Sequence, residues 1–134
     1  YASRATHALS GQDLVAILRQ SREHNQAQGL TGLLCFNDGI FVQVLEGGRE
    51  QVNARYQRIL ADERHRDAIL MSYEEIQERR FAGWTMGQVN LSRLNPALVL
   101  KYSASARLDP YAMSGAALAA LLEELVSAGV SECA

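Results

Sequence analysis

The sequence has no long hydrophobic run and only two cysteines. No stretch reaches the roughly 18 consecutive apolar residues of a membrane-spanning helix, and no basic segment followed by an apolar one opens the chain, so neither a membrane span nor a secretory signal is predicted. Cys35 stands inside an apolar run and Cys133 near the C-terminal end, a spacing that matches neither a disulfide framework nor a metal site. We therefore expect two reduced thiols and a cytoplasmic protein.

Strong charge of either sign is also missing. The 134 residues carry 13 Lys and Arg against 15 Asp and Glu, a formal net charge of −2. This charge lacks the positive field that binding to a nucleic-acid backbone requires. With 48% apolar residues, the chain can bury a core without metal or disulfide staples. The composition predicts one globular domain that does not bind nucleic acid.

The motifs of common enzymes are absent as well. The chain has no Gly-rich phosphate loop, no HExxH helix and no Gly-x-Ser-x-Gly elbow, and its three histidines are not at metal-ligand spacing. Glu46 and the pair Glu74-Glu75 are acids that catalysis could use, but a place beside a turn and a place on the surface explain them better. Cys35 lies between apolar neighbours, which indicates an inert buried thiol. The sequence predicts no metal site and no enzyme.

The sequence does contain a regular succession of helix and strand signals. Ser10 can cap a helix over residues 11–28, Asp13 can complete the capping box, and Gly29 can end the helix. Asp38-Gly39 between two apolar runs is a strong hairpin signal. The other elements expected are strands over 31–36, 40–46, 68–76 and 81–89, a helix over 50–61, and helices that begin after Asn95 and Ser114. The order is (β)αββαββ, followed by C-terminal helices.

Polar side chains interrupt two of these elements. Gln43 stands in the middle of an apolar strand, and an unpaired buried amide costs about 1 to 3 kcal/mol. Gln43 therefore either faces solvent or has specific partners, and the sequence leaves both open. Asn25 stands at the end of the apolar stripe of the first helix. It is either a functional group or part of a fraying helix end, and the sequence leaves both open. Four further residues have an ordinary alternative to a functional role, as solvated loop or core residues: Arg64, His65, Trp84 and Met86.

Five separated blocks of the sequence stand in a distinctive order. They are Tyr1-Ala2-Ser3; Asn25 with Gly29-Leu30-Thr31-Gly32-Leu33-Leu34; Phe41-Val42-Gln43-Val44-Leu45-Glu46-Gly47; Asp62-Glu63-Arg64-His65; and Arg80-Phe81-Ala82-Gly83-Trp84-Thr85-Met86. Together they resemble the BLUF domain, a blue-light sensor that uses a flavin, and residues 98–103 with the following helix are similar to the cap of short PixD-type BLUF proteins. The resemblance implies an α+β fold, with a ferredoxin-like βαββαββ sheet, two helices on one face and additional C-terminal helices.

The resemblance also implies how the chain is divided. Residues 1–90 would form the FAD-binding domain and residues 91–134 a C-terminal helical cap. The family's first strand largely precedes its key tyrosine, which here is Tyr1. We therefore expect further residues of this strand before Tyr1 in the sheet.

The family supplies a role for each residue of the site. The isoalloxazine ring is expected between the first two helices, with Asn25 bonded to its polar edge and Ser21 and His24 within one helical turn. Arg64 and His65 match residues at the ring edge and at the ribityl-phosphate side. The residues expected around the reactive end of the ring, where the photoactive switch lies, are Tyr1, Gln43, Trp84 and Met86.

The implied mechanism is a light-driven exchange of hydrogen bonds. An amide has a donor end and an acceptor end, so Gln43 can bridge the phenol of Tyr1 and the flavin ring. In the family, light makes the flavin a strong oxidant, the tyrosine gives up an electron and a proton, and both return after the amide has rotated or changed tautomer. No net reaction results. The absorption shifts slightly to the red, and the changed contacts of Gln43 affect the last strand near Trp84 and Met86.

Partners and alternatives follow from the same resemblance. Short BLUF chains signal through partner proteins, and PixD-type relatives form dimers and rings, so the leucine stripe after Ser114 is expected to mediate self-association; alternatively, it caps the sheet of its own chain. Two other classes fit the element order: a ferredoxin-like hydrolase of the acylphosphatase type, and an interaction module without a cofactor. Only the flavin sensor should be yellow.

Overall fold

The computed structural model describes residues 1–89, 94–128 and 131–132. Cys133 and the predicted domain boundary between residues 90 and 91 lie outside these ranges. Among the described residues, no helix combines the length and the apolar character needed to cross a lipid bilayer. The helices and strands are β1 (Ala2–Ala5), α1 (Gly11–Gln28), β2 (Thr31–Asn37), β3 (Ile40–Glu46), α2 (Arg49–Ala61), β4 (His65–Ile69), β5 (Gly87–Val89), α3 (Pro96–Tyr102), α4 (Gly115–Ser127) and β6 (Ser131–Glu132).

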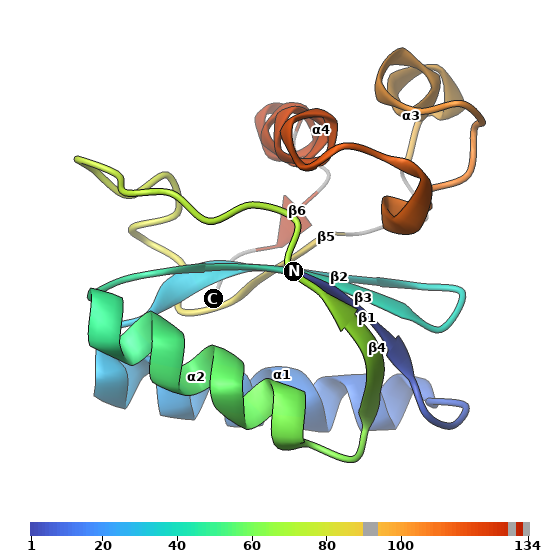
Figure 1. Cartoon of the computed structure of the whole chain (residues 1–134). Coiled ribbons are helices and arrows are strands. Elements are labelled where there is room, and N and C mark those ends of the chain that lie inside the picture. Colours follow the sequence, from blue (N-terminus) through green and yellow to red (C-terminus); the bar gives the residue numbers. More distant parts are fainter. Residues whose placement is uncertain (90–93, 129–130, 133–134) are drawn as a thin grey trace.

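The strands form one mixed sheet that separates two layers of helices. Its order is β4-β1-β3-β2-β5-β6, with β2 and β5 parallel and the other neighbouring pairs antiparallel. The helices α1 and α2 cover one face, and α3 and α4 lie over the other (Figure 1). The predicted α+β fold, a ferredoxin-like sheet with two helices on one face and additional C-terminal helices, is confirmed.

Local signals placed the first half of the chain correctly. The Ser10 side chain accepts a hydrogen bond from the Asp13 amide (3.1 Å), and the Asp13 carboxylate accepts one from the Ser10 amide (2.8 Å). Gly29 ends α1 with φ at +67°, a left-handed conformation that favours glycine. Asp38 and Gly39 have φ at +50° and +75°, as the tight turn of a two-residue hairpin requires. The predicted capping box, helix end and hairpin are confirmed.

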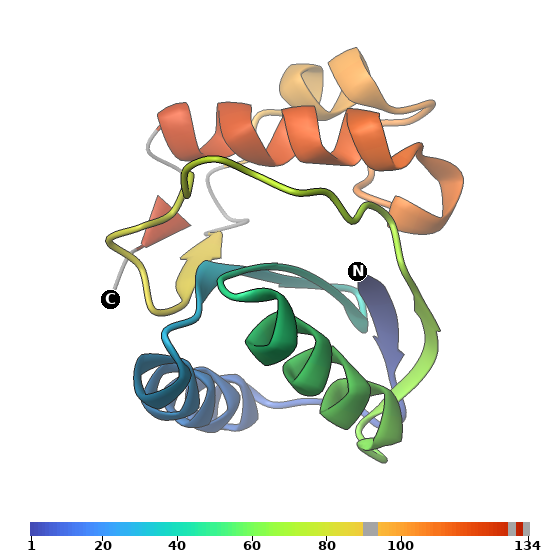
Figure 2. The ribbon, with the colours of Figure 1, turned by 60° about the vertical axis from the view of Figure 1, so that its left-hand side comes forward.

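The strand predicted over residues 68–76 is wrong in its extent. β4 begins earlier, at His65, and its ladder with β1 ends where Ile69 faces Ala2. The chain then crosses between the sheet and α4 (Figure 2). Alternating side chains mark an extended segment with one apolar side, but a strand also needs a neighbouring backbone with which to pair.

The strand predicted over residues 81–89 is also too long. Only Gly87–Val89 belong to β5, and residues 81–86 form turns, the first closed by a hydrogen bond from the Trp84 amide to the Phe81 carbonyl (2.9 Å). The amides of Arg80 and Phe81 donate to the side chain of Glu46 and are therefore not available for a ladder. The short strand β6, which pairs with β5, was not predicted.

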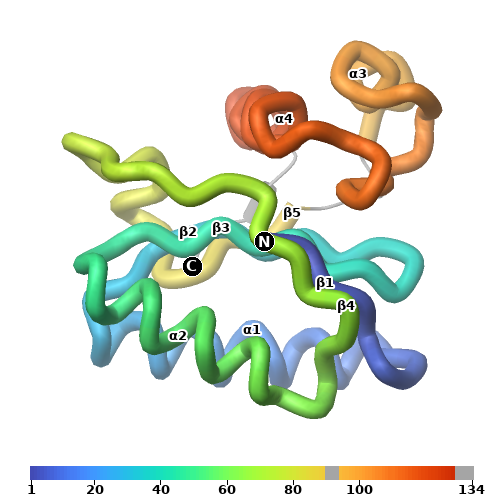
Figure 3. The backbone as a smooth tube through the Cα atoms, in the orientation of Figure 1, coloured from blue at the N-terminus to red at the C-terminus, as the bar shows by residue number. Residues whose placement is uncertain are grey.

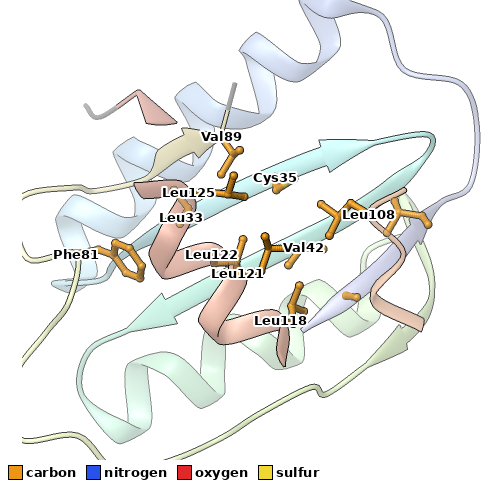
Figure 4. Packing of buried hydrophobic residues seen from close by; sticks show 12 residues of the cluster. Leu33, Cys35, Val42, Phe81, Val89, Leu108, Leu118, Leu121, Leu122 and Leu125 are labelled. Atoms are coloured by element: carbon orange, nitrogen blue, oxygen red, sulfur yellow. The ribbon is translucent and has the colours of Figure 1, made fainter. Parts of the chain in front are cut away.

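The leucine stripe of α4 packs on the chain's own sheet. Figure 4 shows these leucines beside sheet residues that include Leu33, Cys35 and Val42. The stripe contains four leucines that are each at most 3% exposed: Leu118, Leu121, Leu122 and Leu125. The stripe therefore caps the sheet of its own chain, the alternative given above, and these leucines are not available to a second copy.

A cavity of about 540 Å³ lies in line with β1. Its walls come from β3, from residues 70–76, from α2 and from α4, and Tyr1 lies at its end. Figure 3 shows that the N-terminus lies beside the point where the chain leaves β4. The walls include five consecutive residues of β3, Val42 to Glu46, so the cavity runs along this strand.

Candidate functional site

A narrow cleft separates α1 from α2 and has the sheet as its floor. Leu34 and Phe41 make the floor apolar, and three arginines give the walls positive charge. The volume of about 70 Å³ is less than the roughly 300 Å³ of a small cofactor pocket, so a flat ring would enter by parting the two helices. The lining residues are Tyr1, Ile17, Gln20, Ser21, Leu34, Phe41, Gln43, Arg55, Arg58, Ile59, Asp62, Arg64 and His65.

The larger cavity along β3 suits an anionic cofactor less well. Its walls include four carboxylates and only two arginines, and like charges repel a phosphate. The carboxylates are those of Glu46, Glu74, Glu75 and Glu123. The cleft is therefore the better candidate for a flavin nucleotide.

A chain of hydrogen bonds runs along the floor of the cleft. The hydroxyl of Tyr1 donates a hydrogen bond to Gln43 Oε1 at 2.6 Å, and Gln43 Nε2 donates one to Met86 Sδ at 3.5 Å. Gln43 is 5% exposed and Met86 is fully buried. The alternative in which Gln43 faces solvent is thus wrong, and this amide has a partner at each of its two ends.

The phenol of Tyr1 is held as a neutral donor. Burial raises the pKa of Tyr1 well above its ordinary value, although the charge of Arg55 acts in the opposite direction. The ring of Tyr1 packs against Tyr56, with centroids 5.5 Å apart, and against the edge of His65 at 6.4 Å. Tyr1 therefore keeps its proton at neutral pH and presents it to Gln43.

Two buried polar atoms of the described residues have no hydrogen-bond partner: Asn25 Oδ1 and Arg55 Nε. Asn25 is fully buried and its Nδ2 donates to the Thr85 carbonyl at 2.8 Å. An orphaned buried group costs about 1 to 3 kcal/mol, so these atoms favour a ligand. A flavin ring offers an imide N–H to an acceptor such as Oδ1 and carbonyls to a donor such as Nε, and the residues present fit it.

Positive charge gathers at the α2 side of the cleft. The charges of Arg55 and Arg58, together with burial as the larger cause, lower the pKa of His24. Burial also lowers the pKa of His65, and its Nδ1 lies 2.7 Å from the Ser3 hydroxyl. Both imidazoles are thus biased toward the neutral form, and the arginines carry the charge that an anionic group would meet.

Asp62 is the acid that balances this charge. Hydrogen bonds from the Arg64 side chain, at 2.7 to 3.1 Å, lower the pKa of Asp62 to about 2. The pair fixes the position of the Arg64 guanidinium at the wall of the cleft. Arg64 is therefore held in place before any ligand arrives.

The Asp62 pair should make stability depend on pH in the acid range. Because the folded pKa lies below the ordinary value of 3.8, the contribution is present above about pH 4 and is lost as the pH falls toward 2. We expect Asp62→Asn to lower the free energy of unfolding at pH 6 by at most about 1 kcal/mol, since the pair is partly exposed. Urea unfolding at pH 6 and pH 2.5 should show this deficit shrinking. A deficit of equal size at both values would contradict the role of the Asp62 charge.

Trp84 lies away from the Gln43 amide. Its ring stacks on Phe81, with centroids 5.6 Å apart, and packs against the cluster that contains the α4 leucines. A Cβ at Gly87 would lie 2.5 Å from the indole, so only glycine leaves room for this placement. Met86, by contrast, packs on the α1 side of the sheet with Leu34 and Phe41.

Glu46 anchors the segment that leads to these two residues. Its buried carboxylate accepts hydrogen bonds from the amides of Arg80 (2.8 Å) and Phe81 (3.0 Å) and from the hydroxyl of Thr31 (3.2 Å). Sequence reasoning treated Glu46 as an acid beside a turn and missed this role. The signal for it was an acid at the end of an apolar strand, where its side chain is buried with the sheet.

The structure brings most of the predicted residues together. Tyr1, Ser21, Gln43, Arg64 and His65 line the cleft. Asn25 and Met86 border it through their bonds to Thr85 and Gln43. His24 lies near the α2 arginines, and Trp84 is on the other side of the sheet. Sequence reasoning did not single out Arg55 and Arg58; their spacing of three residues on α2, beside the buried Ile59, could have indicated one shared face.

Comparison with known proteins agrees with this geometry. The model of the family described as "BLUF: Sensors of blue-light using FAD" matches residues 1–87. The photoactivated adenylate cyclase subunit beta of Euglena gracilis is 40% identical over 87 residues, which is 64% of this chain and 10% of the relative. This chain thus spans about a tenth of the length of that curated relative.

Solved structures extend the likeness to nearly the whole chain. The dark-state structure of BlrB, a BLUF protein, is 35% identical with a TM-score of 0.78, over 96% of this chain and 92% of that one. Klebsiella pneumoniae BlrP1 with FMN and cyclic diGMP is 29% identical with a TM-score of 0.66, over 96% of this chain and 33% of that one. Since the family model covers more than half of the residues, the chain belongs to the BLUF family of flavin-using blue-light sensors.

Proposed function

We propose that this chain is a photoreceptor module in which Tyr1 and Gln43 respond to a non-covalently bound flavin, and that it passes the signal to a partner protein. The observation that carries the proposal is the 2.6 Å hydrogen bond between Tyr1 Oη and Gln43 Oε1 at the floor of the cleft. It joins a neutral phenol to an amide that also reaches Met86. Light-dependent rearrangement of these bonds is the proposed signal.

Polar groups on both helices would hold the flavin. Asn25 Oδ1 would accept a hydrogen bond from the imide of the ring, Arg55 would donate one to a ring carbonyl, and Ser21 would add a hydroxyl from α1. Arg58 and Arg64 would bind the phosphate, which makes FAD or FMN a better ligand than an uncharged flavin. We assign FAD, in line with the description of the family, and BlrP1 was solved with FMN.

The residues of the switch would undergo no net reaction. When bound, the flavin supplies absorption of blue light and, once excited, a strong oxidant. Tyr1 holds its proton in the dark, and its short bond to Gln43 Oε1 gives that proton a path. An amide turned by half a rotation exchanges its oxygen and nitrogen, so Gln43 then withdraws its donor from Met86 Sδ. The electron that Tyr1 would give to the excited flavin and the proton that would follow it both return to Tyr1, so no net oxidation remains. Until then the changed hydrogen bonds of Gln43 would carry the signal.

The signal leaves through the segment around Met86. Met86 immediately precedes β5, and Trp84 packs with the α4 cluster, so a shift at Met86 reaches the far face of the sheet. The chain matches 33% of BlrP1 and 10% of the cyclase subunit, so the matched part of each belongs to a much longer protein. A separate protein is the proposed receiver here, and any self-association would have to use a surface other than the buried α4 leucines.

We also propose that the chain consists of a flavin-binding domain over residues 1–90 and a helical cap over residues 91–134. The cleft and both of its helices precede residue 90, and α3 and α4 form a cap on the opposite face.

An absorption spectrum before and after blue light tests the proposal directly. A yellow protein whose visible band shifts reversibly to the red is the expected result. A colourless protein that takes up neither FAD nor FMN would overturn flavin binding. A yellow protein without any light-induced shift would overturn the switch.

Asn25→Ala should weaken flavin binding. The change removes a buried acceptor from the polar edge of the site, at a cost of roughly 1 to 3 kcal/mol, or about 5- to 150-fold in affinity. Titration of the apoprotein with FAD, followed by flavin fluorescence, measures the loss. Asn53→Ala, on the exposed side of α2, is the matched control and should bind as the wild type does. Equal affinity in both variants would contradict the assigned pocket.

A further inference from the structure

Three consecutive carbonyls in front of β5 each accept a hydrogen bond from a different donor. They belong to Trp84, Thr85 and Met86. Their donors are, in order, Gly32 N (3.0 Å), Asn25 Nδ2 (2.8 Å) and Arg22 Nε (3.1 Å). The first donor is backbone of β2, and the other two are side chains of α1. The segment beside the Gln43 amide is thus fastened to the sheet and to α1, although it is not part of a ladder.

Arg22 is the charged member of this set. It lies three residues before Asn25, so both side chains project from the same face of α1. Among the described residues, Arg22 forms no ion pair within 4.0 Å. A charged donor makes a stronger hydrogen bond than a neutral one, so the Met86 carbonyl is held more firmly than a neutral amide would hold it.

The residue that Arg22 holds is the one that contacts the switch. The Met86 side chain is fully buried and its Sδ lies 3.5 Å from Gln43 Nε2. A methionine side chain is flexible, so its place against the amide depends on where its backbone is held. We infer that Arg22 is a positioning residue of the light switch: it keeps Met86 against Gln43 and thereby sets how fast the switched state decays.

This inference rests on the proposed function, and its direction follows from the chemistry of the contact. In the dark arrangement an amide N–H points at the Met86 sulfur. After the Gln43 amide has turned, its oxygen faces the sulfur instead, and two acceptors then meet without a proton between them. Because Arg22 holds the Met86 backbone in place, the Met86 side chain can withdraw less far from the turned amide, so that arrangement is disfavoured and the amide returns quickly. Without Arg22, Met86 can give way, and the switched state should last longer.

The test compares three variants of the flavin-loaded protein. Arg22→Ala should slow dark recovery of the absorption spectrum roughly three- to tenfold, and Arg22→Lys, which keeps a charged donor, should restore most of the rate. Arg19→Ala is the matched control, because Arg19 is exposed on the same helix; its recovery should equal that of the wild type. Each rate is measured on samples with the same flavin content.

A second readout needs no light. In protein labelled at the methionine methyl groups, three signals are expected, from Met71, Met86 and Met113. In the dark, Arg22→Ala should shift or broaden the Met86 signal and leave the other two unchanged, whereas Arg19→Ala should change none.

The outcomes separate this inference from the proposed function. An unchanged or faster recovery in Arg22→Ala, or equal shifts of all three methyl signals, would overturn the role of Arg22. Should Arg22→Ala fail to fold, Arg22→Gln, which removes the charge, replaces it: a slower recovery together with a shifted Met86 signal supports the role of Arg22, and wild-type values in both overturn it. A wild-type protein without a red shift would instead speak against the proposed function, and the dark methyl spectrum would still test whether Arg22 positions Met86.

Discussion

Tyr1→Phe and Gln43→Leu should each abolish the light-induced red shift while leaving the flavin bound. Tyr1→Phe keeps the ring that packs on Tyr56 and removes only the hydroxyl, so Gln43 Oε1 loses its 2.6 Å donor. Gln43→Leu keeps most of the volume and removes both polar ends of the bridge. Difference spectra before and after blue light, on samples of equal flavin content, measure the effect.

Tyr56→Phe is the matched control for these two variants. The ring of Tyr56 packs on that of Tyr1, but of these two tyrosines only Tyr1 has a described hydrogen bond to the Gln43 amide. This variant should show the full red shift. A full and reversible shift in Tyr1→Phe or Gln43→Leu would mean that the bridge of Tyr1 and Gln43 is not the switch, even in a protein that binds flavin.

Glu46→Leu should cause the largest loss of stability. The change leaves the part-buried amide of Arg80, the buried amide of Phe81 and the buried Thr31 hydroxyl without their acceptor. At about 1 to 3 kcal/mol for each orphaned group, and with partial relaxation, we expect a loss of about 3 to 5 kcal/mol in the free energy of unfolding. Urea unfolding followed by far-UV circular dichroism measures it.

Two further variants make this prediction specific. Glu46→Gln keeps one acceptor oxygen but turns a donor toward the Arg80 amide, so its loss should lie between those of the wild type and Glu46→Leu. Glu78→Leu changes an exposed acid of the same segment and should alter stability by about 0.5 kcal/mol or less. Equal losses in Glu46→Leu and Glu78→Leu would show that the Glu46 carboxylate does not anchor the segment.

Sequence reasoning succeeded where the deciding interactions are local. The capping box of Ser10 and Asp13 and the turn at Asp38-Gly39 are formed by residues next to one another in the chain, and both were predicted at the correct positions. The predicted end of β4 was wrong because it depends on where β4 stops pairing with β1, a strand more than 60 residues away in the chain. No local pattern carries that information.

The residues of the candidate site were likewise predicted only in part. The resemblance indicated Asn25 and Gln43, but which side of the sheet each of Trp84 and Met86 faces could not be predicted. Residues 81–86 are not a regular strand, so alternation does not apply, and their course is set by the bonds to Glu46. Such long-range contacts are invisible to periodicity and become clear only in the folded chain.

Cys35 lies on the side of the sheet opposite the cleft, so its thiol is separated from any flavin bound there. Cys35 is the thiol of the described part of the chain, and it lies on the α4 side of β2, with the sheet between its sulfur and the cleft. Burial raises its pKa to about 12, so it stays a thiol rather than the reactive thiolate. A flavin bound in the cleft, as proposed above, would therefore have Tyr1 rather than this thiol on its side of the sheet, and the proposed light-driven cycle would not consume Cys35.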